Sequence, residues 1–141
     1  MSADTTQNSV PDIAEGRHNA AWHEFMARII SHLESTREED WVEDVVRSKD
    51  GSKNCLFGHI FSMSEDEKES NRLWDLFECT VATTYMVYPV NDGRDPDYPQ
   101  ATPRQRCLAY LHDLKAGRTE SVLQIMESMD REHRAETQKF A

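Results

Sequence analysis

The chain has no long apolar run. No segment approaches the roughly 18 consecutive apolar residues that a helix needs to cross a bilayer. Its first sixteen residues, MSADTTQNSVPDIAEG, contain neither a basic start nor an apolar stretch of the kind found in secretory leaders. We therefore expect a soluble, cytoplasmic protein that does not enter membranes.

Cysteine is scarce. The three cysteines, Cys55, Cys79 and Cys107, are odd in number, far apart and outside any C-x-x-C pair. This is not the pattern of a disulfide-stabilised secreted domain, so we expect reduced thiols that act as small apolar side chains. Cys55 and His59 have a spacing that can chelate zinc, but a structural site needs four ligands and would have to gather Cys79, Cys107 and His112 from elsewhere. No metal or other cofactor is predicted.

Motifs of common catalytic sites are missing. The chain contains no G-x-S-x-G, no glycine-rich phosphate loop and no H-E-x-x-H. Cys55 and His59 could serve as a nucleophile and its base, and Asp92 could form an acid–base pair with His59 or His112 if the central loop folds back. The residues favour a protein without catalytic activity and keep a small enzyme as the alternative.

Acidic residues, in contrast, are abundant. The 141 residues include 26 Asp and Glu against 16 Lys and Arg, which gives a formal net charge of −10. Residues 1–100 hold 20 of these acidic residues against 9 basic ones. Such a surface repels nucleic acid and anionic lipid and attracts a basic partner, although solubility alone would also explain it.

Apolar residues recur at helical spacing along most of the chain. The segments with this spacing are, in order, 18–35, 36–46, 54–61, 64–88, 102–117 and 122–141. They predict an all-α fold, a single-domain bundle of five to six helices over residues 17–141, after a disordered polar tail at 1–16. A short β-hairpin around residues 44–57, with its turn at SKDGSK, is the alternative for the second helix.

Capping signals mark where the helices start and stop. Capping boxes pair Thr36 with Glu39, Ser64 with Glu67 and Thr102 with Gln105. Three further residues fit the ends of helices: Asn54 as a cap, Pro103 at a first helical position and Gly117 as a stop. Gly58, inside the third helix, is typical of a position where another element packs closely.

A long loop rich in Pro and Asp is predicted at about residues 88–102. The Asn91–Gly93 turn and three prolines, Pro96, Pro99 and Pro103, can hold it rigid without a ligand. Tyr98 is expected to anchor it, with the ring buried and the hydroxyl at the edge. Its aspartates lack the Gly and the closing Glu of a calcium loop, so we interpret it as a connector or a recognition surface.

Four short motifs occur in a recognisable order: Trp41, Cys55-Leu-Phe-Gly58, Asn91-Asp92 and Thr102-Pro103. With them the chain, over roughly residues 20–116, resembles a family of small uncharacterised proteins from actinobacteria and their phages. His59 stands where that family is expected to have a small residue. The resemblance implies a phage or mobile-element context and no established activity.

The leading hypothesis is a non-enzymatic, acidic protein-binding module. It would engage a basic or nucleic-acid-binding protein as an inhibitor or nucleic-acid mimic, in the host cytoplasm if it is phage-encoded, without binding nucleic acid directly. The predicted binding residues are Glu38, Glu39, Asp40, Glu43, Asp44, Glu65, Asp66, Glu67 and Glu69 on acidic faces and Asn91, Asp92, Arg94, Asp95, Asp97 and Tyr98 in the loop. The alternative is a small enzyme or ligand-binding protein with a pocket around Cys55, His59, Asn91 and Asp92. A homodimer is left open.

Overall fold

The computed structural model describes residues 19–139, so the predicted tail at 1–16 lies outside the described residues. The described part of the chain is 64% helical, holds six α-helices and contains no strand, which confirms the all-α prediction. The helices are α2 (Ala20–Glu34), α3 (Leu56–Phe61), α4 (Glu67–Thr80), α5 (Thr84–Asn91), α6 (Pro103–Ala116) and α7 (Val122–Lys139).

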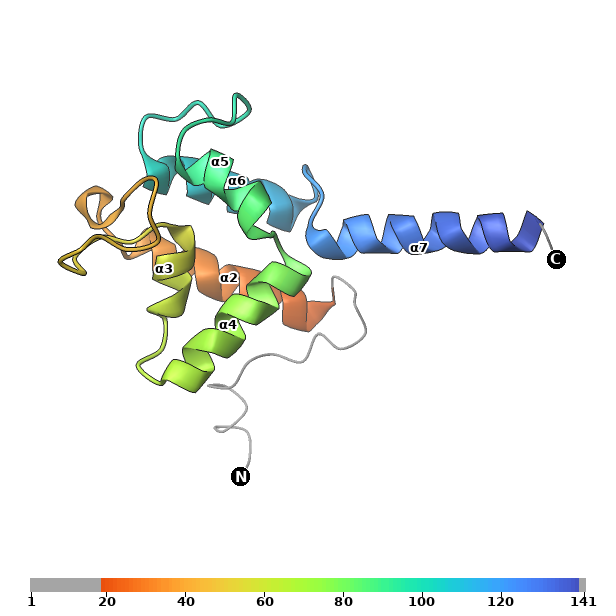
Figure 1. Ribbon diagram of the computed structural model, residues 1–141, viewed down its shortest axis with the longest axis horizontal. Coiled ribbons are helices and arrows are strands. Elements are labelled where there is room, and N and C mark those ends of the chain that lie inside the picture. The colour runs from red at the N-terminus through yellow and green to blue at the C-terminus, as the bar shows by residue number, and fades with distance from the viewer. Residues whose placement is uncertain (1–18, 140–141) are drawn as a thin grey trace.

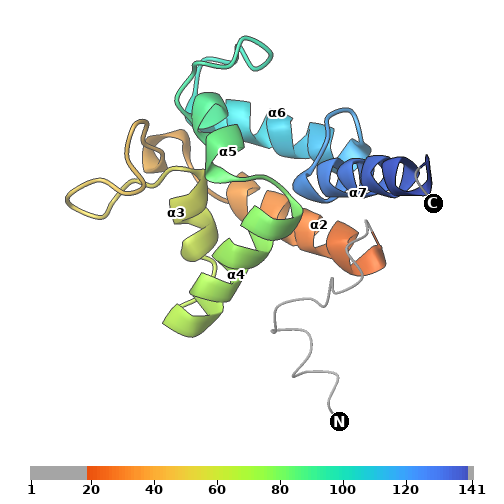
Figure 2. The same ribbon diagram turned by 45° about the vertical axis from the view of Figure 1, so that its right-hand side comes forward.

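The helices pack pairwise around one core. α2 and α5 both lie against α6, and α3 lies against α4 (Figures 1 and 2). α7 contacts α4 near its start and then extends away from the other helices. The bundle therefore consists of α2–α6, and α7 projects from it.

α2 supplies the centre of the core. Asn19 caps it by accepting a hydrogen bond from the Trp22 N–H at 2.9 Å, as Asn does at many helix starts. Trp22 is fully buried, and its indole N–H donates to the Thr80 carbonyl at the end of α4 at 3.0 Å. Phe57 of α3 packs edge-on against Phe77 of α4 with ring centroids 5.3 Å apart. Together these contacts join α2, α3 and α4.

The predicted helix at 36–46 was wrong. Only Glu38–Asp40 form a single 3-10 turn, and the chain then runs as an irregular segment to Cys55. The alternative hairpin is present only as isolated bridges, in which Asn54 pairs with Trp41 and with Arg47. We call residues 41–55 the 41–55 loop.

Several helix starts also differ from prediction. Thr36 makes no capping box, because its hydroxyl accepts the indole N–H of Trp41 at 2.9 Å. Asn54 accepts from Arg47, and Cys55 takes the cap position of α3. α4 begins at Glu67 with Asp66 as its cap, two residues later than predicted. The cap at Thr102 is confirmed, since its hydroxyl accepts the Gln105 N–H at 3.2 Å, which is one of the two hydrogen bonds of the predicted box.

The predicted helix 64–88 is two helices. The chain bends at the fully buried residues Val81 and Ala82, where the Val81 carbonyl accepts the N–H of Val122 at the start of α7. α5 then continues through Pro89 to Asn91, so the predicted loop begins later than residue 88. A proline is tolerated there because the carbonyl it cannot bond belongs to Tyr85, which is 90% exposed in the first turn of α5.

The loop that follows α5 is anchored as predicted. Tyr98 is 8% exposed, and its ring meets that of Tyr110 at a centroid distance of 5.3 Å. Its hydroxyl donates to the Asp113 carboxylate at 2.9 Å. Gly93 supplies the positive φ, 77°, that turns the chain after α5.

Candidate functional site

A buried amide fixes the 41–55 loop to the end of α5. Asn91 is fully buried. Its side-chain oxygen accepts the Leu56 N–H and its amide group donates to the Val42 carbonyl, both at 3.0 Å. Asn91, a predicted binding residue, therefore holds the backbone of two distant segments together and has little capacity left for a ligand.

A buried arginine completes this attachment. Arg106 of α6 is 5% exposed and donates to the carbonyls of Val90, Asn91 and Gln100 at 2.8–2.9 Å. Its guanidinium also forms an ion pair with Glu43 in the 41–55 loop. Burying a charge is costly unless it is paired and hydrogen-bonded, and the Arg106 guanidinium donates four hydrogen bonds.

Three predicted binding residues meet at the surface end of this contact. Asp92 accepts the backbone N–H of Asp44 at 2.9 Å, and Arg94 lies 3.3 Å from the Asp92 carboxylate and 3.4 Å from that of Asp44. Asp44 has a φ of 70°, a left-handed conformation that few non-glycine residues adopt. The hydrogen bond that the Asp44 N–H donates to Asp92 and the ion pair with Arg94 hold Asp44 in that conformation.

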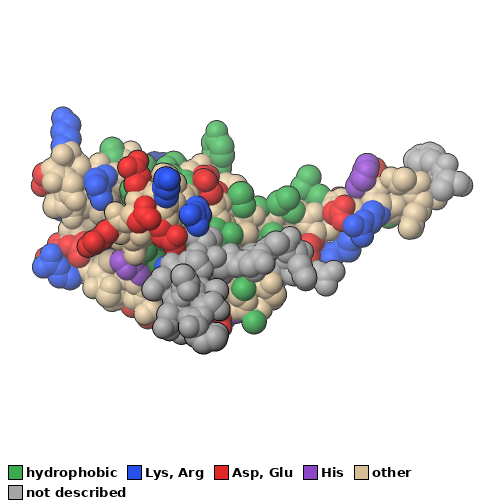
Figure 3. Space-filling view, turned by 90° about the horizontal axis from the view of Figure 1, so that it is seen from below, with side chains coloured by type: hydrophobic (Ala, Val, Ile, Leu, Met, Phe, Trp, Pro, Cys, Tyr) green, Lys and Arg blue, Asp and Glu red, His purple; other side chains and the backbone are tan. Residues whose placement is uncertain are grey.

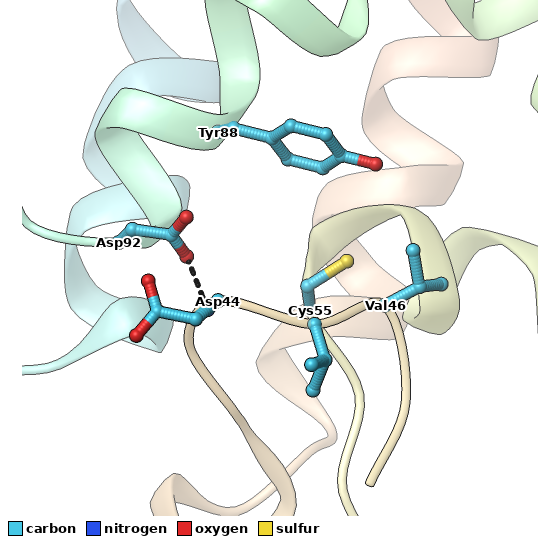
Figure 4. Close-up of a pocket in the computed structure, with 6 residues that line it drawn as sticks. Asp44, Val46, Cys55, Tyr88 and Asp92 are labelled. Carbon is cyan, nitrogen blue, oxygen red and sulfur yellow. Dashed lines mark hydrogen bonds between the residues drawn. The ribbon is translucent and has the colours of Figure 1, made fainter.

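A cavity of about 160 Å³ opens beside these carboxylates. It is lined by Asp44, Val45, Val46, Cys55, Tyr88 and Asp92. In Figure 4 the Tyr88 ring extends across the cavity opposite the Cys55 thiol, with Asp44 and Asp92 at one end and Val46 at the other. The cavity is thus acidic at one end and apolar at the other.

A second cavity, of about 250 Å³, lies on the other side of Val46 and is lined by Val46, Arg47, Asn54, Gly58, Phe61 and Trp74. Beneath the two cavities, Phe57 packs against Trp74 at 4.8 Å and against Tyr88 at 6.2 Å between ring centroids. We call the two cavities together the Val46 groove. Two valines of the groove are unusually accessible to solvent for apolar side chains: Val45 is 51% exposed and Val46 is 36% exposed.

The predicted catalytic constellation does not assemble at this groove. Cys55 lines it, but His59 is 5% exposed and packs against Trp41 at a centroid distance of 4.2 Å. Burial raises the pKa of Cys55, which keeps the thiol protonated, and lowers the pKa of His59 to about 4. Among residues 19–139, no three Cys, His, Asp or Glu side chains gather so as to hold a metal.

The first predicted acidic face is largely paired with arginine. Each of its five carboxylates lies within ion-pair distance of an arginine. Glu39 and Asp40 pair with Arg37, Glu38 with Arg104, Asp44 with Arg94, and Glu43 with Arg106. The hydrogen bond from Arg37 lowers the pKa of Asp40. These carboxylates therefore help to attach the 3-10 turn and the 41–55 loop to the rest of the bundle, and they present little unbalanced charge.

The second predicted acidic face is different. Glu65, Asp66, Glu67 and Glu69 form no ion pair with any described residue, and only Asp66 has a structural role, as the α4 cap that accepts the Lys68 N–H. Further along α4, Glu78 accepts the indole N–H of Trp74 at 2.8 Å, beside the Val46 groove. Figure 3 shows Asp and Glu side chains gathered over the bundle on the face seen from below, with Lys and Arg among them.

Sequence reasoning missed the apolar part of the groove and the buried arginine. Val45 and Val46 fall in the helix predicted at 36–46, and Trp74 and Tyr88 fall in the helix predicted at 64–88. For Arg106 a signal was available, because it lies four residues before Tyr110 on the apolar side of α6 and is therefore expected to turn inward.

Comparison of the chain with family models, with curated proteins and with solved structures found no match. The resemblance to the actinobacterial and phage family therefore stays a prediction. Within the described part of the chain, none of the helices combines the length and the apolar character needed to span a bilayer.

Proposed function

We propose that the protein is a binding module that receives a basic, partly apolar segment of a partner protein in the Val46 groove. The observation that carries this proposal is the exposure of Val45 and Val46 at two cavities that share Val46 and are lined by Tyr88 and Trp74. Pockets that bury an apolar anchor supply most of the affinity of protein interfaces.

The charges around the groove support a basic partner. Asp44 and Asp92 stand at one end, and on α4 the unpaired Glu67 lies seven residues before Trp74 and Glu78 four residues after it, both on the side of Trp74. The opposing charges are Arg94, which Asp44 and Asp92 share, and Arg47, which is engaged with Asn54 and Ser62. Rim carboxylates of this kind speed association and select positively charged segments.

This proposal keeps the basic partner protein of the sequence-based hypothesis and drops the nucleic-acid mimic. A nucleic-acid mimic presents a row of free carboxylates, whereas those at 38–44 are matched with arginines. An inhibitor of a basic protein remains consistent with the groove. The bound element would then be a peptide segment with an apolar anchor flanked by Lys or Arg.

A displayed peptide library tests this without knowledge of the partner. Selection on the intact protein should enrich peptides with an aliphatic or aromatic residue flanked by basic residues, and binding should weaken between about 0.05 and 0.5 M salt because exposed charges are screened. The double variant Val45→Ser, Val46→Ser should lose the selected peptides.

Tyr85→Ser is the matched control, because Tyr85 is another exposed apolar residue and lies outside the groove. It should keep the peptides. Peptides that lack basic residues, or that bind both variants equally, would contradict the proposal.

A further inference from the structure

α7 leaves the bundle after its first two turns. Leu123 is 7% exposed and the Val122 N–H donates to the Val81 carbonyl, whereas all described side chains from Asp130 onward are exposed. Figures 1 and 2 show the rest of the helix extending away from the bundle. A helical segment as short as residues 130–139 is only marginally stable in water without a packing partner. We therefore expect another surface to pack against the outer part of α7.

One side of α7 carries an unpartnered apolar row. Val122, Ile125, Met126 and Met129 recur three and four residues apart, and the two methionines are 58% and 63% exposed. In Figure 3 hydrophobic side chains form a row that runs from the bundle onto the projecting helix. Surface rows of this kind are typical of association sites.

The row is continuous with a groove on the bundle. Tyr85 is 90% exposed and lines a cavity of about 480 Å³ together with Arg118 and Thr119, which directly precede α7. We call this cavity the Tyr85 groove. Its charged lining consists of Arg118, Asp95, Asp97 and Asp113, and only Asp113 is paired with Arg118, at 2.7 Å. Asp95 and Asp97 leave the groove acidic.

The charges along α7 are unevenly distributed. Residues 120–130 hold three acidic residues and no basic one, whereas residues 131–139 hold Arg131, Arg134 and Lys139 against two acidic residues. Arg134 is paired with Asp130 within the helix at 2.9 Å, but the pair is exposed and such pairs are weak. Two such helices attract each other when antiparallel and repel each other when parallel.

We propose that a second copy of this chain is the partner of α7. The two helices pair antiparallel with their apolar rows in contact, related by a twofold axis. Met126 opposite Met129 of the other copy places residues 134–139 beyond the start of the other copy's α7, next to the connection whose Arg118 and Thr119 line the Tyr85 groove. The basic end of each helix then lies near Asp95 and Asp97 of the other copy. This pairing does not use the Val46 groove, so it stands apart from the proposed function.

Sedimentation equilibrium over a range of concentrations measures the pairing. The row is short, so we expect a reversible dimer with a dissociation constant on the order of micromolar to tens of micromolar. Met126→Glu with Met129→Glu should raise this constant at least about tenfold, since charges would enter the apolar contact. Val45→Ser, at an exposed valine outside the interface, should leave it unchanged. A monomer at all concentrations up to about 100 µM, or a dimer that the methionine changes do not weaken, would overturn the proposal.

A charge exchange tests where the basic end lies. Arg134→Glu should weaken the dimer, and Arg134→Glu combined with Asp97→Arg should restore it, because the two groups face each other across the interface. All changed side chains are exposed, so helical circular dichroism should be unaltered. Failure of the second change to restore the dimer would refute the docking on the Tyr85 groove.

Spin labels distinguish the two helix directions. With Cys79→Ser removing the exposed native thiol, a label at Gln138→Cys should give an intermolecular distance of about 30 Å in the antiparallel pair. A parallel pair would bring the labels within about 20 Å. The shorter distance would refute the antiparallel arrangement.

Discussion

Protonation of His59 should destabilise the fold in mild acid. The imidazole is 5% exposed, lies against the Trp41 ring, and its Nε2 has no hydrogen-bond partner among the described residues. Burial lowers the pKa of His59 from 6.5 to about 4, with a smaller contribution from His32. A charged imidazole at this position would be desolvated without an acceptor for its second N–H.

The pKa shift fixes both the pH window and the size of the effect. Between pH 6.5 and about 4 the unfolded chain binds a proton at His59 that the folded protein does not. The free energy of unfolding therefore rises with pH across this window. The contribution that the neutral His59 makes to it is fully present above pH 6.5 and is lost as the pH falls towards 4. The shift corresponds to a loss on the order of 3 kcal/mol, with a slope of at most about 1.4 kcal/mol per pH unit for one proton. Burial also lowers the pKa of His32, which adds to the loss.

Urea denaturation at a series of pH values tests this prediction. His59→Phe keeps a ring against Trp41 but cannot titrate, so its unfolding free energy should fall much less between pH 6.5 and 4. The slope is the readout, because it is independent of any constant change in stability caused by the substitution. His112→Gln, at an exposed histidine of α6, should keep the slope of the unchanged protein. Equal slopes for His59→Phe and the unchanged protein would refute the reasoning.

Substitutions at three further positions, all followed by urea denaturation, test the attachment of the 41–55 loop. Arg106→Ala leaves three carbonyls and Glu43 without their donor and should cost on the order of 3–5 kcal/mol; Arg106→Lys should recover little, because an ammonium cannot reproduce the guanidinium fork. Asn91→Ala removes the partner of two backbone groups in a fully buried site and should cost about 2–4 kcal/mol; a loss below about 0.5 kcal/mol would mean that water replaces the amide. Gly58→Ala would place a methyl group 2.6 Å from the Val46 carbonyl and 2.7 Å from the Asn54 side-chain oxygen, so it should destabilise by about 1–3 kcal/mol although Ala favours helix; a stabilised variant would show that the loop moves aside.

Local signals predicted the helices that local interactions determine. The Asn19–Glu34 segment has a strong apolar stripe and a cap one residue from the predicted start, and α6 has its Thr102 cap, a proline at the first position and Gly117 at the end. Each of these signals acts within one or two turns of the chain, which is the range that a sequence pattern reports. The starts and ends of these two helices therefore did not depend on contacts with the rest of the fold.

The 41–55 loop could not be predicted in the same way, because its partners are far away in the sequence. Asn91 bonds Val42 across 49 residues and Leu56 across 35, and Arg106 reaches Glu43 across 63. Helical spacing of Trp41, Val45 and Val46 suggested a helix, but a helix would have taken the Val42 carbonyl away from the buried Asn91 amide and Glu43 away from the Arg106 guanidinium. The cost of those unpaired groups, a few kcal/mol each, exceeds the small helical preference of a short segment.

The difference between local signals and contacts that are distant in the sequence also governs the electrostatics of the candidate site. Composition reports the number of carboxylates, whereas the field outside the protein depends on which of them lie beside a cation. Three arginines from after the loop, Arg94, Arg104 and Arg106, are matched with the 38–44 carboxylates, and no sequence pattern indicates that they converge there. The charge left unbalanced is therefore at the start of α4 and beside the Val46 groove. A partner attracted by this field would meet exposed valines next to carboxylates, so affinity and charge selectivity would come from the same surface.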